Sequence, residues 1–118
     1  MKQFRFLDWK IYLSAQSLFQ KVLAVTRKLP KEYRFDVGSQ LIRSSFSVVL
    51  NIAEGSGKKS DKDLGRFLDI SLGSLYETLA ALHTLHLVGY LSDEEILAFK
   101  EEMSDVGRQI GGFKKVLD

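Results

Sequence analysis

The sequence predicts an all-α protein: an up-down-up-down antiparallel four-helix bundle that assembles as a homo-oligomer. Two observations predict the bundle. Apolar residues recur in alternating steps of three and four along four stretches, and the connections between these stretches are short. Because short connections force consecutive helices to lie antiparallel, residues 1–118 are expected to form a single bundle domain. The expected helices span residues 7–29, 36–54, 61–88 and 93–117.

Proline and glycine mark the C-terminal ends of the first two expected helices. Pro30 ends the first, because the residue before a proline is displaced from the α conformation. The segment Gly55-Ser56-Gly57 is expected to end the second, with a glycine in the left-handed C-cap conformation. The periodic positions are Ile11, Ala15, Leu18, Val22, Val25 and Leu29 in the first helix, and Gly38, Ile42, Ser45, Val49 and Ile52 in the second.

Serine caps begin the last two expected helices. Ser60 is the N-cap of the third, and Ser92 forms a capping box with Glu95 at the start of the fourth. Gly89 ends the third helix. The periodic positions are Leu68, Leu72, Leu75, Leu79, Leu82 and His86 in the third helix, and Ile96, Phe99, Met103, Val106, Ile110, Phe113 and Leu117 in the fourth.

The second and third expected helices carry more apolar surface than one core-facing stripe requires, and the first adds apolar residues off its stripe. Exposed apolar surface of this kind usually marks an interface. We therefore expect a homo-oligomer. A seam of small residues on the third helix (Ser71, Ser74 and Thr78) adds to this surface. The alternative is a wide core within one monomer. The candidate interface residues are Trp9, Leu13, Phe46, Phe67 and Ile70.

The net charge of +2 conceals an asymmetry along the chain. Residues 1–34 hold eight basic and two acidic residues, whereas residues 92–118 hold four basic and seven acidic. Two interpretations stay open: complementary faces within the bundle or between subunits, and a basic surface for a phosphate backbone. The candidate nucleic-acid-binding residues are Lys10, Lys21 and Lys28 on one face of the first helix, and Lys58, Lys59, Lys62 and Arg66 around the second connection.

Several polar residues are candidates for a buried network that fixes helix register, with a binding role as the alternative. Gln40 and Asn51 lie with Ser44 and Ser47 on one flank of the second helix. Glu54 lies at a helix C-terminus, where an acid is unfavourable and needs a compensating cation or other donor. Glu77 lies near Gly73 and Arg66 on the third helix.

The sequence favours no catalytic, metal or cofactor chemistry. His83 and His86 lack the Glu-x-x-His pairs of bundle metal sites. The glycine-rich segment at residues 55–60 has the wrong spacing for a phosphate loop and follows a helix. No serine lies in a Gly-x-Ser-x-Gly elbow, so we expect no enzyme. The sequence also has no signal peptide and no long apolar span, which predicts a cytoplasmic protein with no membrane contact.

Two sequence blocks resemble a known family. Residues 47–57 (SVVLNIAEGSG), together with Arg66-Phe67-Leu68 and residues 73–77 (GSLYE), resemble the signature of the bacterial four-helix bundle proteins, also called 23S rRNA intervening-sequence proteins. Weaker upstream matches are Trp9 with Lys10, and Gln40-Leu41 with Arg43. The resemblance adds Ser74 to Asn51, Glu54 and Glu77 as family-motif polar positions.

The resemblance implies a homopentameric bundle without enzymatic activity. A related branch, the accessory proteins of diversity-generating retroelements, binds nucleic acid and partners a reverse transcriptase. We therefore expect a non-catalytic homopentamer that associates with RNA or another nucleic acid through its basic clusters. The alternative is a protein-interaction scaffold or accessory subunit, for example to a reverse transcriptase, that does not bind nucleic acid itself.

Overall fold

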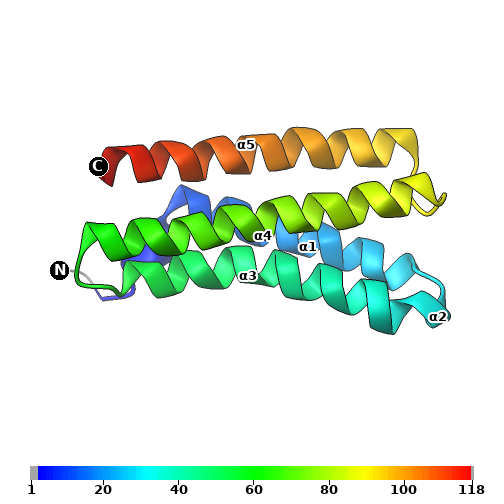
Figure 1. Cartoon of the computed structure of the whole chain (residues 1–118), viewed down its shortest axis with the longest axis horizontal. Coiled ribbons are helices and arrows are strands. Elements are labelled where there is room, and N and C mark those ends of the chain that lie inside the picture. Colours follow the sequence, from blue (N-terminus) through cyan, green and yellow to red (C-terminus); the bar gives the residue numbers. More distant parts are fainter. Residues whose placement is uncertain (1–2, 118) are drawn as a thin grey trace.

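Four long helices account for most of the chain in the computed structural model, which describes residues 3–117 (Figure 1). They are α1 (Lys10–Lys28), α3 (Ser39–Ser56), α4 (Asp61–Leu87) and α5 (Asp93–Leu117). A 3-10 turn, η1 (Arg5–Asp8), precedes α1, and the short α2 (Lys31–Tyr33) and a π-helical turn, η2 (Arg34–Gly38), lead into α3. No strand occurs within residues 3–117, so the all-α prediction is confirmed.

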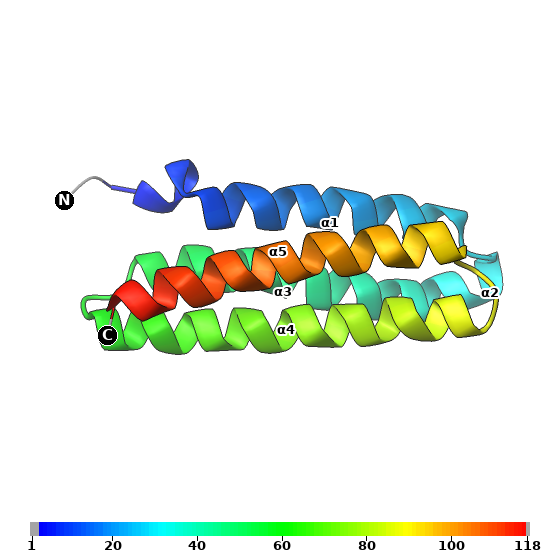
Figure 2. The ribbon, with the colours of Figure 1, turned by 90° about the horizontal axis from the view of Figure 1, so that it is seen from above.

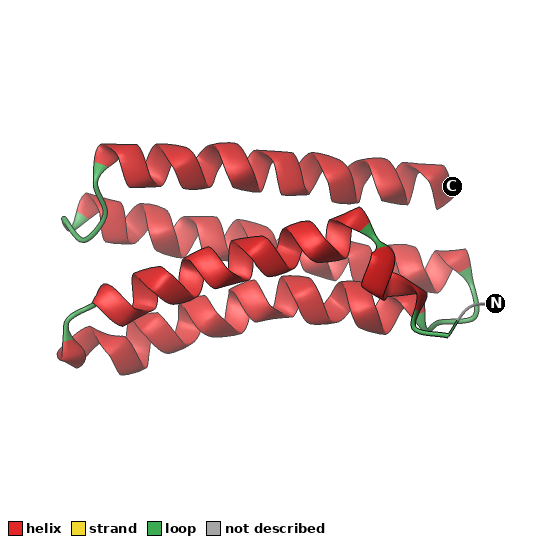
Figure 3. Ribbon diagram, turned by 180° about the vertical axis from the view of Figure 1, so that it is seen from behind, coloured by secondary structure: helices red, strands yellow, loops and turns green. Residues whose placement is uncertain are grey.

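The long helices run alternately up and down, as expected for short connections (Figures 1 and 2). Around the bundle, α1 packs beside α3, α3 beside α4, α4 beside α5, and α5 closes the ring against α1. The loops that join the long helices lie at the two ends of the bundle (Figure 3). One end carries the α3–α4 turn and both termini, and the other carries α2 and the α4–α5 turn. Assembly into a homo-oligomer stays a prediction.

The core follows the predicted stripes, except on α3, where the predicted Ile42 is exposed and Leu41 and Val48 are buried instead. Burying one large aliphatic side chain contributes about 1.5–3 kcal/mol, so a continuous stripe on each helix is sufficient to hold the helices together. Among residues 3–117, no helix has both the length and the apolar character needed to cross a membrane. The side chains most fully buried between the helices include Leu18, Val22, Leu41, Val48, Ile52, Leu64, Leu68, Leu82, Val106 and Ile110.

Two helix ends differ from the predictions at the N-terminal half of the bundle. The first helix begins at Lys10 rather than at residue 7, because Trp9 is extended (φ −75°, ψ 133°) and its ring packs on Phe113 with 4.6 Å between centroids. The second helical segment begins earlier than residue 36, since α2 and η2 continue without a break into α3. A helical wheel assumes 3.6 residues per turn throughout, so it does not predict a π-helical turn, whose hydrogen bonds span five residues.

The predicted left-handed cap at the end of α3 is wrong. Gly57 has φ −88°, which is a right-handed value, and α3 includes Gly55 and Ser56. Gly55 serves close packing instead, because a Cβ added there would lie 2.8 Å from Phe67 Cβ and 2.9 Å from Leu64 Cδ1. The glycine therefore lets α3 and α4 approach each other just before the turn that joins them.

The predicted caps of α4 and α5 are confirmed. The Asp63 N–H donates to Ser60 Oγ at 3.1 Å. At the start of α5, the Glu95 N–H donates to Ser92 Oγ at 3.0 Å and the Ser92 N–H donates to Glu95 Oε1 at 2.9 Å. Gly89 ends α4 with φ 92°, a left-handed conformation that favours glycine.

Candidate nucleic-acid interface

The three predicted lysines of α1, Lys10, Lys21 and Lys28, are all exposed. The structure places Lys21 and Lys28 along a groove between α1 and α5, opposite Glu95 and Glu102. Lys21 Nζ forms an ion pair with the Glu102 carboxylate. The pKa of Glu95 is lowered by its hydrogen bond from the Ser92 N–H, and Lys28 lowers it further. The basic first helix and the acidic last helix are thus complementary faces within one bundle.

The second predicted basic cluster surrounds the α3–α4 turn and consists of Lys58, Lys59, Lys62 and Arg66, all exposed. Lys58 Nζ lies 5.0 Å from the centroid of the Phe67 ring, and Arg66 Cζ lies 5.6 Å from it. Cation–π contacts of this kind contribute about 0.5–1 kcal/mol at exposed sites. Phe67, predicted at an oligomer interface, is half-buried, and its ring contacts two cations of its own chain.

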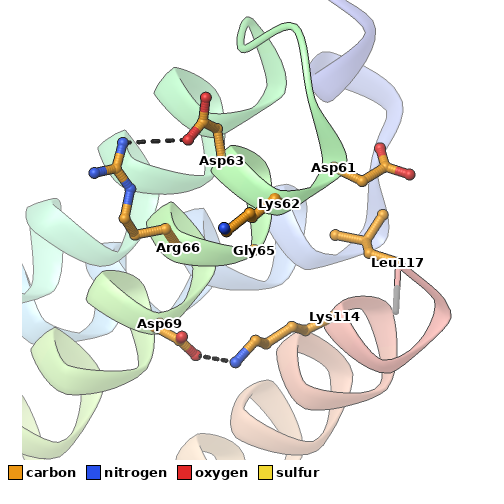
Figure 4. Close-up of a pocket in the computed structure, with 8 residues that line it drawn as sticks. All are labelled: Asp61, Lys62, Asp63, Gly65, Arg66, Asp69, Lys114 and Leu117. Atoms are coloured by element: carbon orange, nitrogen blue, oxygen red, sulfur yellow. Dashed lines mark hydrogen bonds and ion pairs between the residues drawn. The ribbon is translucent and has the colours of Figure 1, made fainter.

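An open hollow of about 520 Å³ lies beside this turn, between the start of α4 and the end of α5 (Figure 4). Three basic side chains that line it, Lys62, Arg66 and Lys114, alternate with three carboxylates. Arg66 Nη2 lies 3.4 Å from Asp63 Oδ1, and Lys114 Nζ lies 2.6 Å from Asp69 Oδ1. The hollow is therefore balanced in charge and is not a dedicated anion site.

Lys58 and Lys59 do not line this hollow and do not take part in its ion pairs. Within residues 3–117, neither lysine has a carboxylate within ion-pair distance, whereas Lys21, Arg66 and Lys114 each do. Both lie in the α3–α4 turn at one end of the bundle, and both are exposed (Figure 1). Of the predicted basic residues, this pair is the best placed to contact a phosphate.

The polar seam between α3 and α4 is the most highly hydrogen-bonded contact in the described chain. Ser47 Oγ and Ser74 Oγ lie 2.8 Å apart, and Asn51 Nδ2 donates to the Ser47 carbonyl at 2.9 Å. Thr78 Oγ1 donates to Ser44 Oγ at 2.8 Å. Ser71 Oγ donates to the Val48 carbonyl at 2.9 Å. Ser71, Ser74 and Thr78, taken from the sequence as part of an excess surface, instead face α3 within the chain.

Three of the predicted network residues lie elsewhere. Gln40, Glu54 and Glu77 are exposed in the single chain, so their prediction as members of a buried network is wrong there. Glu77 directly precedes the buried Thr78 on α4, yet its own side chain is exposed. A helical wheel places a flank correctly but does not show how far the neighbouring helix covers it.

Arg5, which the sequence did not single out, compensates the end of α3. Its Nε and Nη2 atoms both donate to the Ser56 carbonyl at 3.3 Å, and its guanidinium lies 5.1 Å from the Trp9 ring. A cation at a helix C-terminus interacts favourably with the helix dipole. This contact provides the positive charge that Glu54, in the last turn of α3, was predicted to need.

The predicted oligomer-interface residues divide into two groups. Trp9 packs on Phe113 and Phe67 lies beneath its two cations, so both contribute to the single chain. Leu13, Phe46 and Ile70 point outward and are 52%, 43% and 46% exposed. Phe46 stacks on Phe19 of α1 at 5.0 Å between centroids, and the exposed Ile42 and Leu50 flank it on α3. The apolar stripe (Ile42, Phe46 and Leu50) therefore runs along α3.

A family comparison decides the identity of the bundle. The family model of the 23S rRNA-intervening sequence protein matches residues 7–112, which is nearly the whole chain. The chain belongs to this family. No curated protein matches it. Both blocks of the intervening-sequence signature, residues 47–57 and 73–77, lie on the two helices that form the serine seam.

A solved structure shares the fold of this intervening-sequence family member. It is the crystal structure of a protein with unknown function from the S23 ribosomal protein family of Bacteroides thetaiotaomicron. The two superpose with a TM-score of 0.82 at 20% sequence identity, over 89% of this chain and 98% of that one. At this identity the likeness shows the fold.

Proposed function

We propose that this chain is a non-catalytic, cytoplasmic RNA-binding bundle that acts as a homopentamer. The observation that carries the RNA-binding proposal is the lysine pair at the α3–α4 turn, Lys58 and Lys59, which is exposed and has no carboxylate partner within residues 3–117. Phosphate contacts from such lysines position a nucleic acid without reading its sequence. In a ring of subunits the pair is repeated once per copy, which multiplies a weak contact.

Salt dependence of RNA binding tests this proposal. Binding of a structured RNA is measured by fluorescence anisotropy over a range of salt concentrations for the unaltered chain, for the double variant K58Q/K59Q, and for K21Q. Each phosphate contact contributes about 0.7 (single strand) to 0.9 (duplex) to the slope of log affinity against log salt. For a structured RNA, the double variant is therefore expected to lose a slope of about 1.4–1.8 per subunit engaged.

The K21Q variant is the control, because it removes an exposed lysine charge from a residue that already forms an ion pair with Glu102. Its slope is expected to stay close to that of the unaltered chain. Absence of binding at low salt, binding that does not depend on salt, or equal losses in the two variants contradicts the proposal.

A second candidate function rests on the apolar stripe of α3 (Ile42, Phe46 and Leu50). Apolar side chains exposed in a row mark a protein interface. If that interface holds a different protein, the chain is a scaffold or accessory subunit. A pull-down that returns one stoichiometric protein and no RNA supports this candidate over the first.

A further inference from the structure

A second pocket lies at the opposite end of the bundle from the lysine pair. Its volume is about 760 Å³, and its walls come from η2, the start of α3, the last turns of α4 and the α4–α5 turn. Figures 1 and 2 show these segments together at the end that carries α2. Val37, Ala81 and Leu85 form its apolar part, and Tyr33 and Tyr90 stand at its edge.

The two tyrosines form an aromatic corner. Their ring centroids lie 5.6 Å apart with an interplanar angle of 54°, and both rings are 41% exposed. Gly89, with its left-handed backbone, turns the chain so that Tyr90 packs against Tyr33 of α2. Both tyrosines also line the pocket, and the face of an aromatic ring carries negative potential that attracts a cation.

The lining of the pocket carries one formal charge. Among the residues that line it, Asp36 is the one with a formal charge, and it forms no ion pair within residues 3–117. The guanidinium of the nearby Arg34 is held elsewhere, because its Nη2 donates to the Leu29 carbonyl at 3.1 Å. Partial burial, then Tyr33 and Glu32, raise the pKa of Tyr90. The pocket therefore places one carboxylate without an ion-pair partner beside an apolar floor.

The backbone that presents Asp36 is itself unusual. Asp36 and Val37 belong to the π-helical turn η2, which is wider than an α-helical turn. Turns of this kind are rare and frequently occur at functional sites. Gly38 ends the turn against Thr26 and Leu29, which ties η2 to the C-terminal end of α1.

We propose that this pocket binds a weakly hydrated organic cation, a guanidinium or alkylated ammonium group on an apolar body. The cationic head lies against the exposed surfaces of the Tyr33 and Tyr90 rings, on the pocket side, and next to the Asp36 carboxylate. The apolar body lies over Val37, Ala81 and Leu85. The Asp36 carboxylate repels a simple anion. A small hydrated metal ion would lose water over the apolar floor without gaining ligands there, so it is disfavoured.

The test uses a pair of probes that differ in charge alone. Acetylcholine and its neutral carbon isostere 3,3-dimethylbutyl acetate are titrated into the full-length chain, and amide shifts are followed by NMR. Acetylcholine is expected to shift amides in residues 33–40 and 81–90 and to saturate. The neutral isostere is expected to bind about five- to tenfold more weakly. Equal binding of the two probes, or no localised shifts with either, overturns the proposal.

Variants assign the contacts. D36N removes the charge and keeps the shape, and Y90L removes the aromatic face and keeps an apolar side chain. Each is expected to weaken acetylcholine binding about fivefold or more. E101Q, which removes an exposed carboxylate from α5, is the control and is expected to bind like the unaltered chain. The amide spectra verify that D36N and Y90L are folded. If the folded variants bind acetylcholine as tightly as the unaltered chain does, the proposed binding site is contradicted.

A third arm distinguishes the source of the cation. An arginine-bearing tripeptide with apolar neighbours is titrated in the same way as acetylcholine. Tighter binding by the peptide, with added shifts at the exposed Phe35, assigns the cation to a protein side chain. Tighter binding by acetylcholine assigns it to a free small molecule. Either result supports the proposal, and failure of both probes overturns it without affecting the RNA-binding proposal.

Discussion

The hydroxyl oxygens of Ser47 on α3 and Ser74 on α4 lie 2.8 Å apart, and this hydrogen bond joins the two sequence blocks that carry the resemblance to the family. The bond from Ser71 to the Val48 carbonyl and the bond between Thr78 and Ser44 repeat the connection along the same contact. Interhelical distance depends on side-chain size, so small residues bring these helices close. In this chain the signature therefore has a structural role: it forms the two sides of one helix–helix contact.

Gly55 gives the first test of that contact. In G55A the new Cβ lies against Phe67 Cβ and Leu64 Cδ1 at distances that real Cβ atoms do not adopt, so α3 and α4 must separate. Overpacking of this kind costs about 1–3 kcal/mol, which exceeds the gain of about 1 kcal/mol in helix propensity. We expect the free energy of unfolding, measured in urea, to fall.

Gly73 provides the matched control on α4. A Cβ added there has no atom within 4 Å, so G73A gains helix propensity without a clash. The variant is expected to be more stable by about 0.5–1 kcal/mol. A loss of stability in G73A, or a gain in G55A, contradicts the packing described for the α3–α4 contact.

Glu77 and Thr78 are neighbours in sequence with opposite roles in stability. Thr78 is fully buried, and its hydroxyl bonds to Ser44 Oγ and to the Ser74 carbonyl, so T78V is expected to cost about 1–2 kcal/mol. Glu77 is exposed, and E77A is expected to change stability by less than about 0.5 kcal/mol. Thermal unfolding of both variants measures the difference. A large loss in E77A would place Glu77 in a network, contrary to its position here.

Glu95 links stability to acid pH. Its hydrogen bond from the Ser92 N–H lowers its pKa in the folded chain below the ordinary value of 4.5. The carboxylate therefore stabilises the fold fully above pH 4.5, and this contribution is lost as the pH falls through the lowered pKa. E95Q keeps the capping geometry without the titration, so its unfolding free energy is expected to fall less steeply in acid.

NMR titration of the side-chain carboxyl group is the direct measurement for Glu95. Its pKa is expected to lie below the ordinary value of 4.5. A pKa for Glu95 at or above 4.5, or acid limbs of equal steepness for E95Q and the unaltered chain, contradicts the assignment.

Periodicity predicted the helices well because the buried stripes are long and nearly uninterrupted. The caps at Ser60, Ser92 and Gly89 were predictable for the same local reason: each depends on residues three or four positions apart. The start of α1 was not predictable in this way, since it depends on Trp9 meeting Phe113 from the far end of the chain.

The candidate site was harder to predict, because the sequence shows where charged residues are but not which oppositely charged residues lie beside them in the fold. The lysines of α1 and those of the α3–α4 turn look alike in sequence, yet Lys21 pairs with Glu102, which is 81 residues away. Likewise, Glu77 and Ser74 share a sequence block, but only Ser74 faces α3. In each case a contact distant in sequence decides the role of the residue.

The apolar stripe of α3 (Ile42, Phe46 and Leu50) gives the last prediction, which concerns assembly. Phe46 is 43% exposed beside Phe19, so its outer face is available to a second copy, and F46S removes the largest side chain of the stripe. We expect sedimentation at micromolar concentration to show a mass well above 13.4 kDa for the unaltered chain and a shift toward that mass for F46S. L97S is the control, because Leu97 on α5 is also exposed but lies outside the stripe. Hot-spot aromatic residues typically contribute about 2 kcal/mol or more to an interface, so the loss in F46S is expected to be large. A monomeric unaltered chain, or equal dissociation of F46S and L97S, shows that this stripe does not join the subunits.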